Sequence, residues 1–259
     1  MTSAANREAT MLDEPYLLIT GASSGIGRAM AIELSDKHRL ILGGRDMGRL
    51  QQAQSECSAP ERHLVWRHDL AEVENIAGGL AALLAEHDAT VCAYVHCAAL
   101  LSILPLRSLT PAMIAETFHV NVFSAMEIIR ALTKKKINNQ QLKAVVFISS
   151  IASKFGAKGF SAYSASKGAL DSLMKSLAIE LAPHVRVNSI LPGALHTPMT
   201  ASMFDDPELV AKFEQVYPLG IGRPLDVINA VEFLLSDKAR WITGQQIVID
   251  GGRTSNISA

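Results

Sequence analysis

Short apolar runs of strand length recur along this chain, and longer segments with helical spacing separate them. The predicted strands cover Tyr16–Thr20, Leu40–Gly43, His63–Arg67, Val91–His96, Ala144–Ser149, Arg186–Ile190 and Gln246–Ile249. The predicted helices cover Gly25–Lys37, Met47–Glu56, Val73–Glu86, Pro111–Lys136, Ala162–Leu181 and Pro224–Ser236. Because strands that alternate with helices need right-handed crossovers, this pattern predicts an α/β fold with a doubly wound, Rossmann-like parallel sheet. We expect about seven strands and helices on both faces.

No Pro/Ser-rich linker, charge block or repeat divides the 259 residues. We therefore expect a flexible N-terminal tail over residues 1–14 and one catalytic domain over residues 15–259. Residues 195–222 interrupt the alternation with prolines and glycines around a short predicted helix, Pro207–Val216. A long excursion between core elements is often a binding loop, so this segment is a predicted substrate lid.

The composition favours small-molecule chemistry in a reducing compartment. A formal net charge of -1 gives no broad attraction for nucleic acid or an anionic membrane. Cys57, Cys92 and Cys97 are too few and too scattered for a disulfide framework, and no CxxC pair suggests a metal. No apolar run approaches the roughly 20 residues of a membrane helix. We predict a cytoplasmic protein without metal, nucleic-acid or membrane partners.

A glycine-rich turn follows the first predicted strand and leads into the first predicted helix. Glycines let the backbone approach a ligand, and the free N–H groups of a helix start favour a pyrophosphate. Glycines also serve ordinary turns, but their place between strand and helix predicts a dinucleotide site. The expected contacts in this turn are Gly21, Ser23, Ser24, Gly25, Ile26 and Gly27.

Tyr163 and Lys167 lie four residues apart near the start of a helical segment and therefore share one helical face. A phenol is a poor base at neutral pH, but a neighbouring ammonium favours the phenolate and is expected to lower the tyrosine pKa. A tyrosine tuned in this way exchanges a proton with a substrate oxygen. Taken alone, the pair is equally typical of a surface lysine beside a half-buried tyrosine.

The Gly-x-x-x-Gly-x-Gly turn after Thr20 and the Tyr-x-x-x-Lys pair together resemble the short-chain dehydrogenase/reductase family. The resemblance extends from about Tyr16 to Gly252. It implies a catalytic set in which a serine binds the substrate oxygen and an asparagine holds a water that links the lysine to solvent. The family spacing selects Ser150, thirteen residues before the tyrosine, rather than its neighbour Ser149. The implied set is Asn121, Ser150, Tyr163 and Lys167.

The resemblance also implies further cofactor contacts. An Asp-Leu pair lies against adenine, and the segment after the fourth strand approaches the cofactor closely. A Pro-Gly pair followed by a threonine closes over the nicotinamide, and the catalytic tyrosine and lysine contact the cofactor as well. These contacts are Asp69, Leu70, Cys97, Ala98, Ala99, Tyr163, Lys167, Pro192, Gly193, Leu195 and Thr197. One departure stands out, because His96–Ala99 replaces the family's Asn-Asn-Ala-Gly. A cysteine in a buried strand is more often a small apolar filler than a nucleophile, and we interpret His96 as a packed strand-end histidine.

The end of the second predicted strand bears on cofactor preference. An NAD-selective site places there a carboxylate that bonds the ribose hydroxyls and repels a 2′-phosphate. Gly44 occupies this position, and Arg45 beside it is suited to bind the phosphate. Asp46 reaches the ribose instead if the strand ends later, and Arg28 either adds positive potential or is solvated. We predict NADP(H), with NAD(H) as the alternative.

The resemblance implies an NADP(H)-dependent oxidoreductase that interconverts a carbonyl and a secondary alcohol by hydride transfer, with Tyr163 as general acid/base. The alternatives are a 3-oxoacyl-thioester reductase of fatty acid synthesis and a non-catalytic nucleotide-binding regulator. Apolar residues spread around Val120–Leu132 more widely than one sheet-facing stripe requires. We expect this helix and the helix that follows Tyr163 to form the contact of a homotetramer or a homodimer.

Overall fold

The computed structural model describes residues 14–255, apart from the side chains of residues 202, 203 and 209. The predicted tail over residues 1–14 therefore lies outside the described residues, except for Glu14. The strands are β1 Tyr16–Thr20, β2 Leu40–Gly44, β3 Leu64–Arg67, β4 Val91–His96, β5 Ala144–Ile148, β6 Arg186–Pro192 and β7 Gln246–Ile249. The helices are α2 Gly25–Leu34, α3 Met47–Ser55, α4 Val73–Glu86, α5 Pro111–Phe118, α6 Ser124–Leu132, α7 Lys135–Asn138, α8 Ser161–Glu180, α9 Ala201–Phe204, α10 Pro207–Val216 and α11 Pro224–Leu235.

The strands form one seven-stranded sheet in the order β3-β2-β1-β4-β5-β6-β7, and every neighbouring pair is parallel. This arrangement confirms the predicted Rossmann-like fold. The chain builds outward from β1 to β3 and then returns to the other side of β1 with β4. The carboxyl ends of β1 and β4 thus border the switch point of the strand order, where open α/β sheets bind their ligands. Thr20 and His96 are paired at these two ends.

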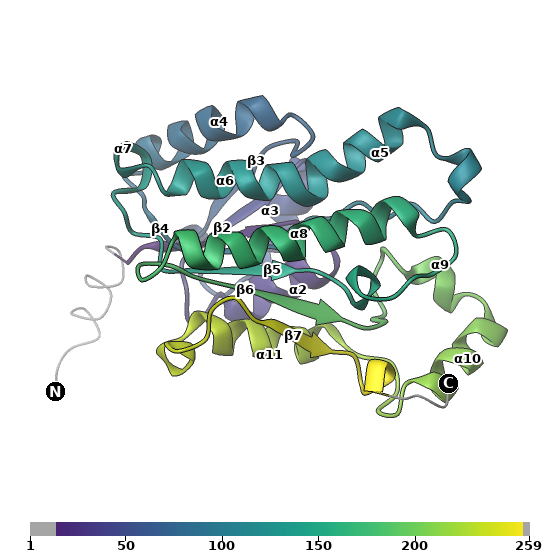
Figure 1. Ribbon diagram of the computed structural model, residues 1–259. Coiled ribbons are helices and arrows are strands. Elements are labelled where there is room, and N and C mark those ends of the chain that lie inside the picture. Colours follow the sequence, from purple (N-terminus) through teal and green to yellow (C-terminus); the bar gives the residue numbers. More distant parts are fainter. Residues whose placement is uncertain (1–13, 256–259) are drawn as a thin grey trace, which may run out of the picture.

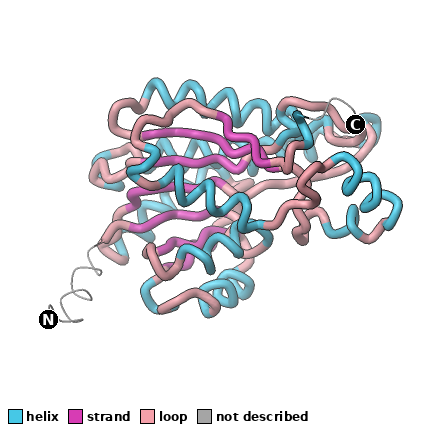
Figure 2. Tube along the Cα trace, turned by 90° about the horizontal axis from the view of Figure 1, so that it is seen from below, coloured by secondary structure: helices cyan, strands magenta, loops and turns pink. Residues whose placement is uncertain are grey.

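Both faces of the sheet are covered (Figures 1 and 2). Helices α4, α6 and α8 lie on one face, and α2 and α11 lie on the other. Neighbouring residues of a strand face opposite layers, so that Tyr94 packs into the first core and Val95 into the second. This double burial explains why the strands appear in the sequence as continuous apolar runs.

The predicted helix Pro111–Lys136 is wrong in detail, because the structure divides it. Helix α5 passes through a π-helical turn, His119–Phe123, into α6, and α7 follows separately. Within the turn the Ser124 hydroxyl donates to the Val120 carbonyl (2.7 Å). Hydrophobic periodicity does not reveal the extra residue of such a turn, and π-helical turns often occur at functional sites.

The apolar residues over Val120–Leu132 are largely covered by other parts of this chain. Val120 and Val122 are buried in the π-helical turn, and the apolar residues of α6 pack against α4 and the sheet. Phe123 and Met126 keep 43% and 45% of their surface exposed. Most of these apolar residues are therefore covered by this chain, and the predicted oligomer stays a prediction. Within residues 14–255, no helix is long and apolar enough to cross a membrane.

Candidate functional site

The carboxyl ends of the central strands open into a cavity of about 550 Å³. The wall includes nearly all residues predicted to contact a cofactor: Gly21, Ser23, Ser24, Gly25, Ile26, Arg45, Asp69, Leu70, Cys97, Ala98, Ala99, Tyr163, Lys167, Pro192, Gly193, Leu195 and Thr197. Gly27 lies outside the described wall. Of the predicted catalytic residues, Ser150, Tyr163 and Lys167 line the cavity, whereas Asn121 does not. The fold thus brings the glycine-rich turn and the Ser-Tyr-Lys group to one space.

The glycine-rich turn packs too closely to accommodate side chains. A Cβ on Gly27 would lie 2.3 Å from the Gly21 carbonyl oxygen, and a Cβ on Gly21 would lie 2.8 Å from the Ala98 nitrogen. Gly21 and Gly25 also have positive φ angles of +71° and +54°. Ser24 precedes α2 without a side-chain cap, so the N–H groups of the helix start face the cavity uncapped. This cradle fits the pyrophosphate of a dinucleotide.

Helix α8 presents Tyr163 and Lys167 to the cavity from its first two turns. The Lys167 Nζ lies 5.6 Å from the centre of the Tyr163 ring and donates to the Ile148 carbonyl (2.8 Å). Ser150 follows β5, and its Oγ accepts from the Ala152 N–H (3.1 Å). Neighbouring Ser149 is buried, and its hydroxyl donates to the Lys167 carbonyl (3.4 Å).

Burial controls the titration of this group. It raises the pKa of Tyr163 to about 12, against the opposing effect of the Ser150 hydrogen bond. It also lowers the pKa of Lys167 to about 8. The expectation that the lysine lowers the tyrosine pKa is therefore wrong in this structure. The reason is that burial of the phenol itself outweighs the effects that lower its pKa, while the Lys167 amine is directed to the Ile148 carbonyl.

Asp171 is a neighbour of this group that the sequence reasoning missed. It is buried one helical turn beyond Lys167, and its negative charge opposes the fall of the lysine pKa. Neither carboxylate oxygen has a hydrogen-bond partner among the described residues. The signal was present in the sequence, because Tyr163, Lys167 and Asp171 follow one another at four-residue helical spacing.

Asn121 acts behind the cavity wall. It is fully buried in the π-helical turn, and its side chain bonds both backbone groups of Leu100 (2.7 and 3.0 Å). The same amide donates to Ser166 of α8 (2.9 Å). Asn121 therefore ties the loop after β4 to the helix that carries Tyr163.

His96 braces the switch point of the sheet. Its Nδ1 lies 2.7 Å from the Tyr94 hydroxyl and 3.1 Å from the Thr20 hydroxyl, while Nε2 has no partner among the described residues. Burial lowers the pKa of His96 to about 3, and the positive charge of Lys167 acts in the same direction. The ring is therefore neutral, in agreement with the predicted packed histidine. Burial also raises the pKa of Cys97 to about 12, which keeps this sulfur an unreactive thiol.

The far end of the cavity is positively charged. Strand β2 ends at Gly44, and Arg45, Arg49 and His68 line the wall beside it. Asp46 is occupied as the N-cap of α3, where its Oδ1 accepts from the Arg49 N–H (3.1 Å). The sequence reasoning missed Arg49, although it lies four residues after Arg45.

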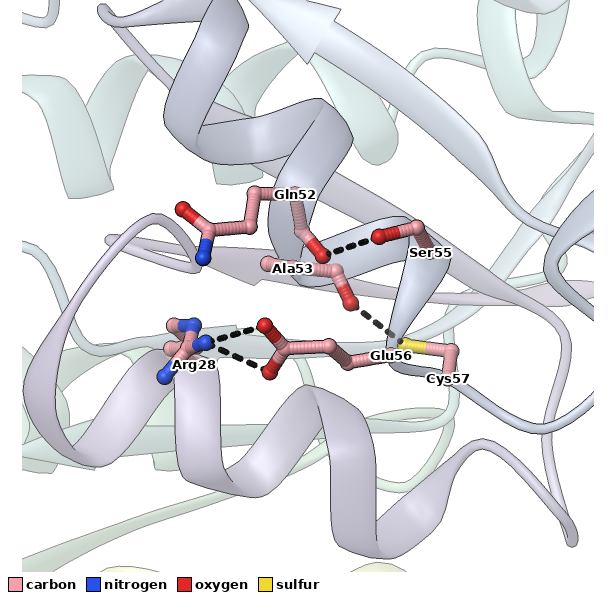
Figure 3. A network of polar contacts seen from close by, with 6 residues as sticks. All are labelled: Arg28, Gln52, Ala53, Ser55, Glu56 and Cys57. Carbon is pink, nitrogen blue, oxygen red and sulfur yellow. Dashed lines mark hydrogen bonds and ion pairs between the residues drawn. The ribbon is translucent and has the colours of Figure 1, made fainter.

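Arg28 does not contribute to this charged end. Its guanidinium nitrogen lies 2.5 Å from both carboxylate oxygens of Glu56, which follows α3 (Figure 3). Beside this ion pair, the Cys57 sulfur donates to the Ala53 carbonyl (3.3 Å). Arg28 thus joins α2 to the end of α3 and does not line the cavity.

The two ends of the segment between β6 and α11 lie side by side. Leu195 and Gly222 form an isolated parallel bridge, and the Ala194 N–H donates to the Tyr217 hydroxyl (2.9 Å). Helix α10 has the bounds that the sequence predicted. An aromatic row packs α9 and α10 together through His196, Phe204, Phe213 and Tyr217.

Within residues 14–255, no group of three or more His, Cys, Asp or Glu side chains could hold a metal ion.

Comparisons with known proteins agree along most of the chain. A family model described as enoyl-(acyl carrier protein) reductase matches residues 21–254. "Carbonyl reductase [NADPH] 2" of Sus scrofa is 33% identical over 91% of this chain and 94% of its own length. "L-xylulose reductase" of Bos taurus is 31% identical, again over 91% and 94%. The structure of a 4-hydroxyisoleucine dehydrogenase complexed with NADH superposes with a TM-score of 0.86 at 29% identity, covering 94% of this chain and 100% of that one.

Proposed function

The chain belongs to the short-chain dehydrogenase/reductase family, and we propose that it is an NADP(H)-dependent enzyme that interconverts a carbonyl and a secondary alcohol with Tyr163 as general acid/base. One observation carries this proposal. Ser150, Tyr163 and Lys167 line the same cavity as the glycine-rich turn and the charged end at Arg45. A dinucleotide that reaches from one end to the other thus meets both a phosphate cradle and a proton-transfer group.

The titration of the group favours a proton on Tyr163 at neutral pH. With a pKa near 12, the phenol is the form that donates a proton to a carbonyl oxygen during reduction. Ser150 donates a second hydrogen bond to that oxygen and stabilises the charge that develops on it. Lys167, with a pKa near 8, exchanges protons near neutral pH and returns a proton to the phenolate that remains. A bound nicotinamide supplies the hydride chemistry at the carbonyl carbon.

Asn121 is a positioning residue in this proposal. Its three side-chain hydrogen bonds fix Leu100 at the cavity wall and hold α8 at the depth that presents Tyr163. The residues between β6 and α11 act as the substrate lid, because their two ends meet at Leu195 and Gly222 while α9 and α10 project beyond the sheet.

The preference for NADP(H) rests on the charged end of the cavity. Gly44 places no carboxylate beside the ribose, and Asp46 is occupied as a helix cap. Arg45 and Arg49 are suited to form charge-assisted hydrogen bonds to a 2′-phosphate. NAD(H) is the alternative cofactor, because these exposed arginines do not prevent its binding.

We propose further that the protein is a cytoplasmic homotetramer or homodimer that contacts its copies through α6 and α8. Exposed apolar side chains lie on α6 (Met126), on α8 (Ile179) and in the π-helical turn before α6 (Phe123), and Ile179 has 79% of its surface exposed. Such residues are typical of a covered interface. Light scattering at micromolar concentration tests the assembly, and a monomer mass would contradict it.

The central experiment compares wild-type protein with Tyr163→Phe. The phenylalanine ring keeps the packing and loses only the transferable proton, so we expect turnover of ketones with NADPH to fall by about 10³-fold or more. The dissociation constant for NADPH, measured by fluorescence titration, should change by less than about threefold. Substantial turnover by the purified variant would refute the assignment.

A further inference from the structure

The reaction end of the cavity has few free hydrogen-bonding groups for a substrate. The Ser149 hydroxyl is bonded to the backbone of α8 (3.4 Å). The Thr200 hydroxyl lies 3.0 Å from the Thr197 hydroxyl and donates to a backbone carbonyl of the lid segment (2.6 Å). Among the described hydroxyls of this end, those of Ser150 and Tyr163 are left to donate to a substrate. In the proposed function both bind the same oxygen, so a second substrate hydroxyl finds no partner there.

The remaining wall of this end is apolar. Leu100 and Leu101 line it from the loop after β4, and Pro198 and Met199 line it from the lid segment. Asn121 holds Leu100 in place through both backbone groups, so this side of the wall is fixed. A polyhydroxylated substrate would place its hydroxyls against these side chains without hydrogen bonds, which is unfavourable where the substrate displaces water from them.

The loop after β4 continues directly from this wall to a second hollow. Ile103, Leu104 and Pro105 line that hollow together with Lys158 and Gly159 of the loop before α8. The Leu104 N–H donates to the Gly159 carbonyl (3.0 Å). Gly159 has a φ of +81°, and a Cβ there would lie 3.0 Å from the Ile103 side chain. The hydrogen bond joins the two loops, and the hollow begins at Ile103, shortly after Leu101 of the cavity wall on the same loop.

We propose that the substrate is a ketone or secondary alcohol whose carbon chain carries no further hydroxyl groups. Leu100, Leu101 and Met199 contact the chain beside the reacting carbon, and the hollow at Ile103 receives the far end of a long chain. This inference rests on the proposed function and adds the substrate class to it. The same loop forms the wall and the hollow, and this continuity identifies the occupant of the hollow as the substrate chain.

Steady-state kinetics with NADPH over the 2-ketones from 2-butanone to 2-decanone test the substrate class. Each buried methylene should raise kcat/KM by about fourfold until the hollow is filled. D-erythrulose, a trihydroxylated butanone, should fall below 2-octanone by about 100-fold or more. A kcat/KM for D-erythrulose equal to or above that for 2-octanone would overturn the inference and leave the proposed function standing.

The hollow is tested with Ile103→Ser, whose side chain is 44% exposed and whose replacement leaves the core intact. We expect a loss of about tenfold in kcat/KM for 2-decanone and less than about twofold for 2-butanone. Leu106→Ser is the matched control. Leu106 lies on the same loop with 72% of its surface exposed, and it lines neither the cavity nor the hollow. Equal losses for both ketones, or equal effects of the two variants, would contradict the hollow as a subsite.

A binding measurement separates this inference from the proposed function. Calorimetry with Tyr163→Phe in the presence of NADPH gives ketone affinities without turnover. Tighter binding of 2-decanone than of D-erythrulose supports the apolar site, even if the wild-type protein reduces no ketone and the proposed function fails. Tighter binding of D-erythrulose refutes the apolar site, whatever the wild-type protein reduces.

Discussion

Removal of the two arginines at the far end of the cavity should abolish the preference for NADP(H). In the double variant Arg45→Ala/Arg49→Ala, each lost guanidinium removes a charge-assisted hydrogen bond to the 2′-phosphate. Such bonds contribute about 1.5–3 kcal/mol, and we take the lower value because both side chains are exposed to screening water. Two of them amount to about 3 kcal/mol, or about 150-fold in kcat/KM for NADPH. NADH lacks the phosphate, so its kcat/KM should change by less than about threefold.

The assay measures kcat/KM for both cofactors at low and high salt, because the arginine contribution should shrink as salt screens it. Arg28→Ala is the matched control, since Arg28 is bound to Glu56 and should affect neither cofactor by more than about threefold. Adding Gly44→Asp supplies the missing carboxylate; its Cβ would lie 3.2 Å from the Leu50 side chain, which must shift slightly. Equal losses with NADPH and NADH, or a wild-type protein that prefers NADH, would refute the reasoning.

Three further predictions concern the glycine-rich turn, the hydrogen bonds of His96 and the buried Lys167. Gly27→Ala places a Cβ 2.3 Å from the Gly21 oxygen. Fluorescence titration should show about 100-fold weaker NADPH binding, and urea unfolding should show a free energy of unfolding lower by about 1–3 kcal/mol. Unchanged binding would contradict the close packing. His96→Phe removes the imidazole that the buried Tyr94 and Thr20 hydroxyls bond and should lower the free energy of unfolding by about 2 kcal/mol. A loss below about 0.5 kcal/mol would show that these hydrogen bonds are unimportant. The Lys167 pKa falls from 10.5 to about 8 on folding, so the protonated amine disfavours the folded state at low pH. The free energy of unfolding of the wild type relative to Lys167→Met should therefore rise between pH 8 and pH 10.5. A difference that does not change with pH would contradict the shift.

The sequence was sufficient for the fold and for most of the cavity wall. The alternation of strands and helices and the place of the glycine-rich turn are local patterns that hydrophobic periodicity and turn chemistry fix within about twenty residues. The same patterns placed Tyr163 and Lys167 on one helical face. They did not reveal the π-helical turn before α6. One extra residue rotates the following side chains by about 100° around the helix axis, and we interpreted the wide apolar spread of this segment as an oligomer contact.

What only the tertiary structure decided depends on contacts between distant residues. Lys167 bonds the carbonyl of Ile148, nineteen residues away, and the burial of Tyr163 reverses the expected direction of the tyrosine pKa. Arg28 is held by Glu56, twenty-eight residues away, which leaves the phosphate end to other cations. Local patterns indicate which groups share an edge of the sheet, whereas charge, solvation and hydrogen-bond partners are fixed only when the whole chain has packed, since each depends on every group that surrounds it.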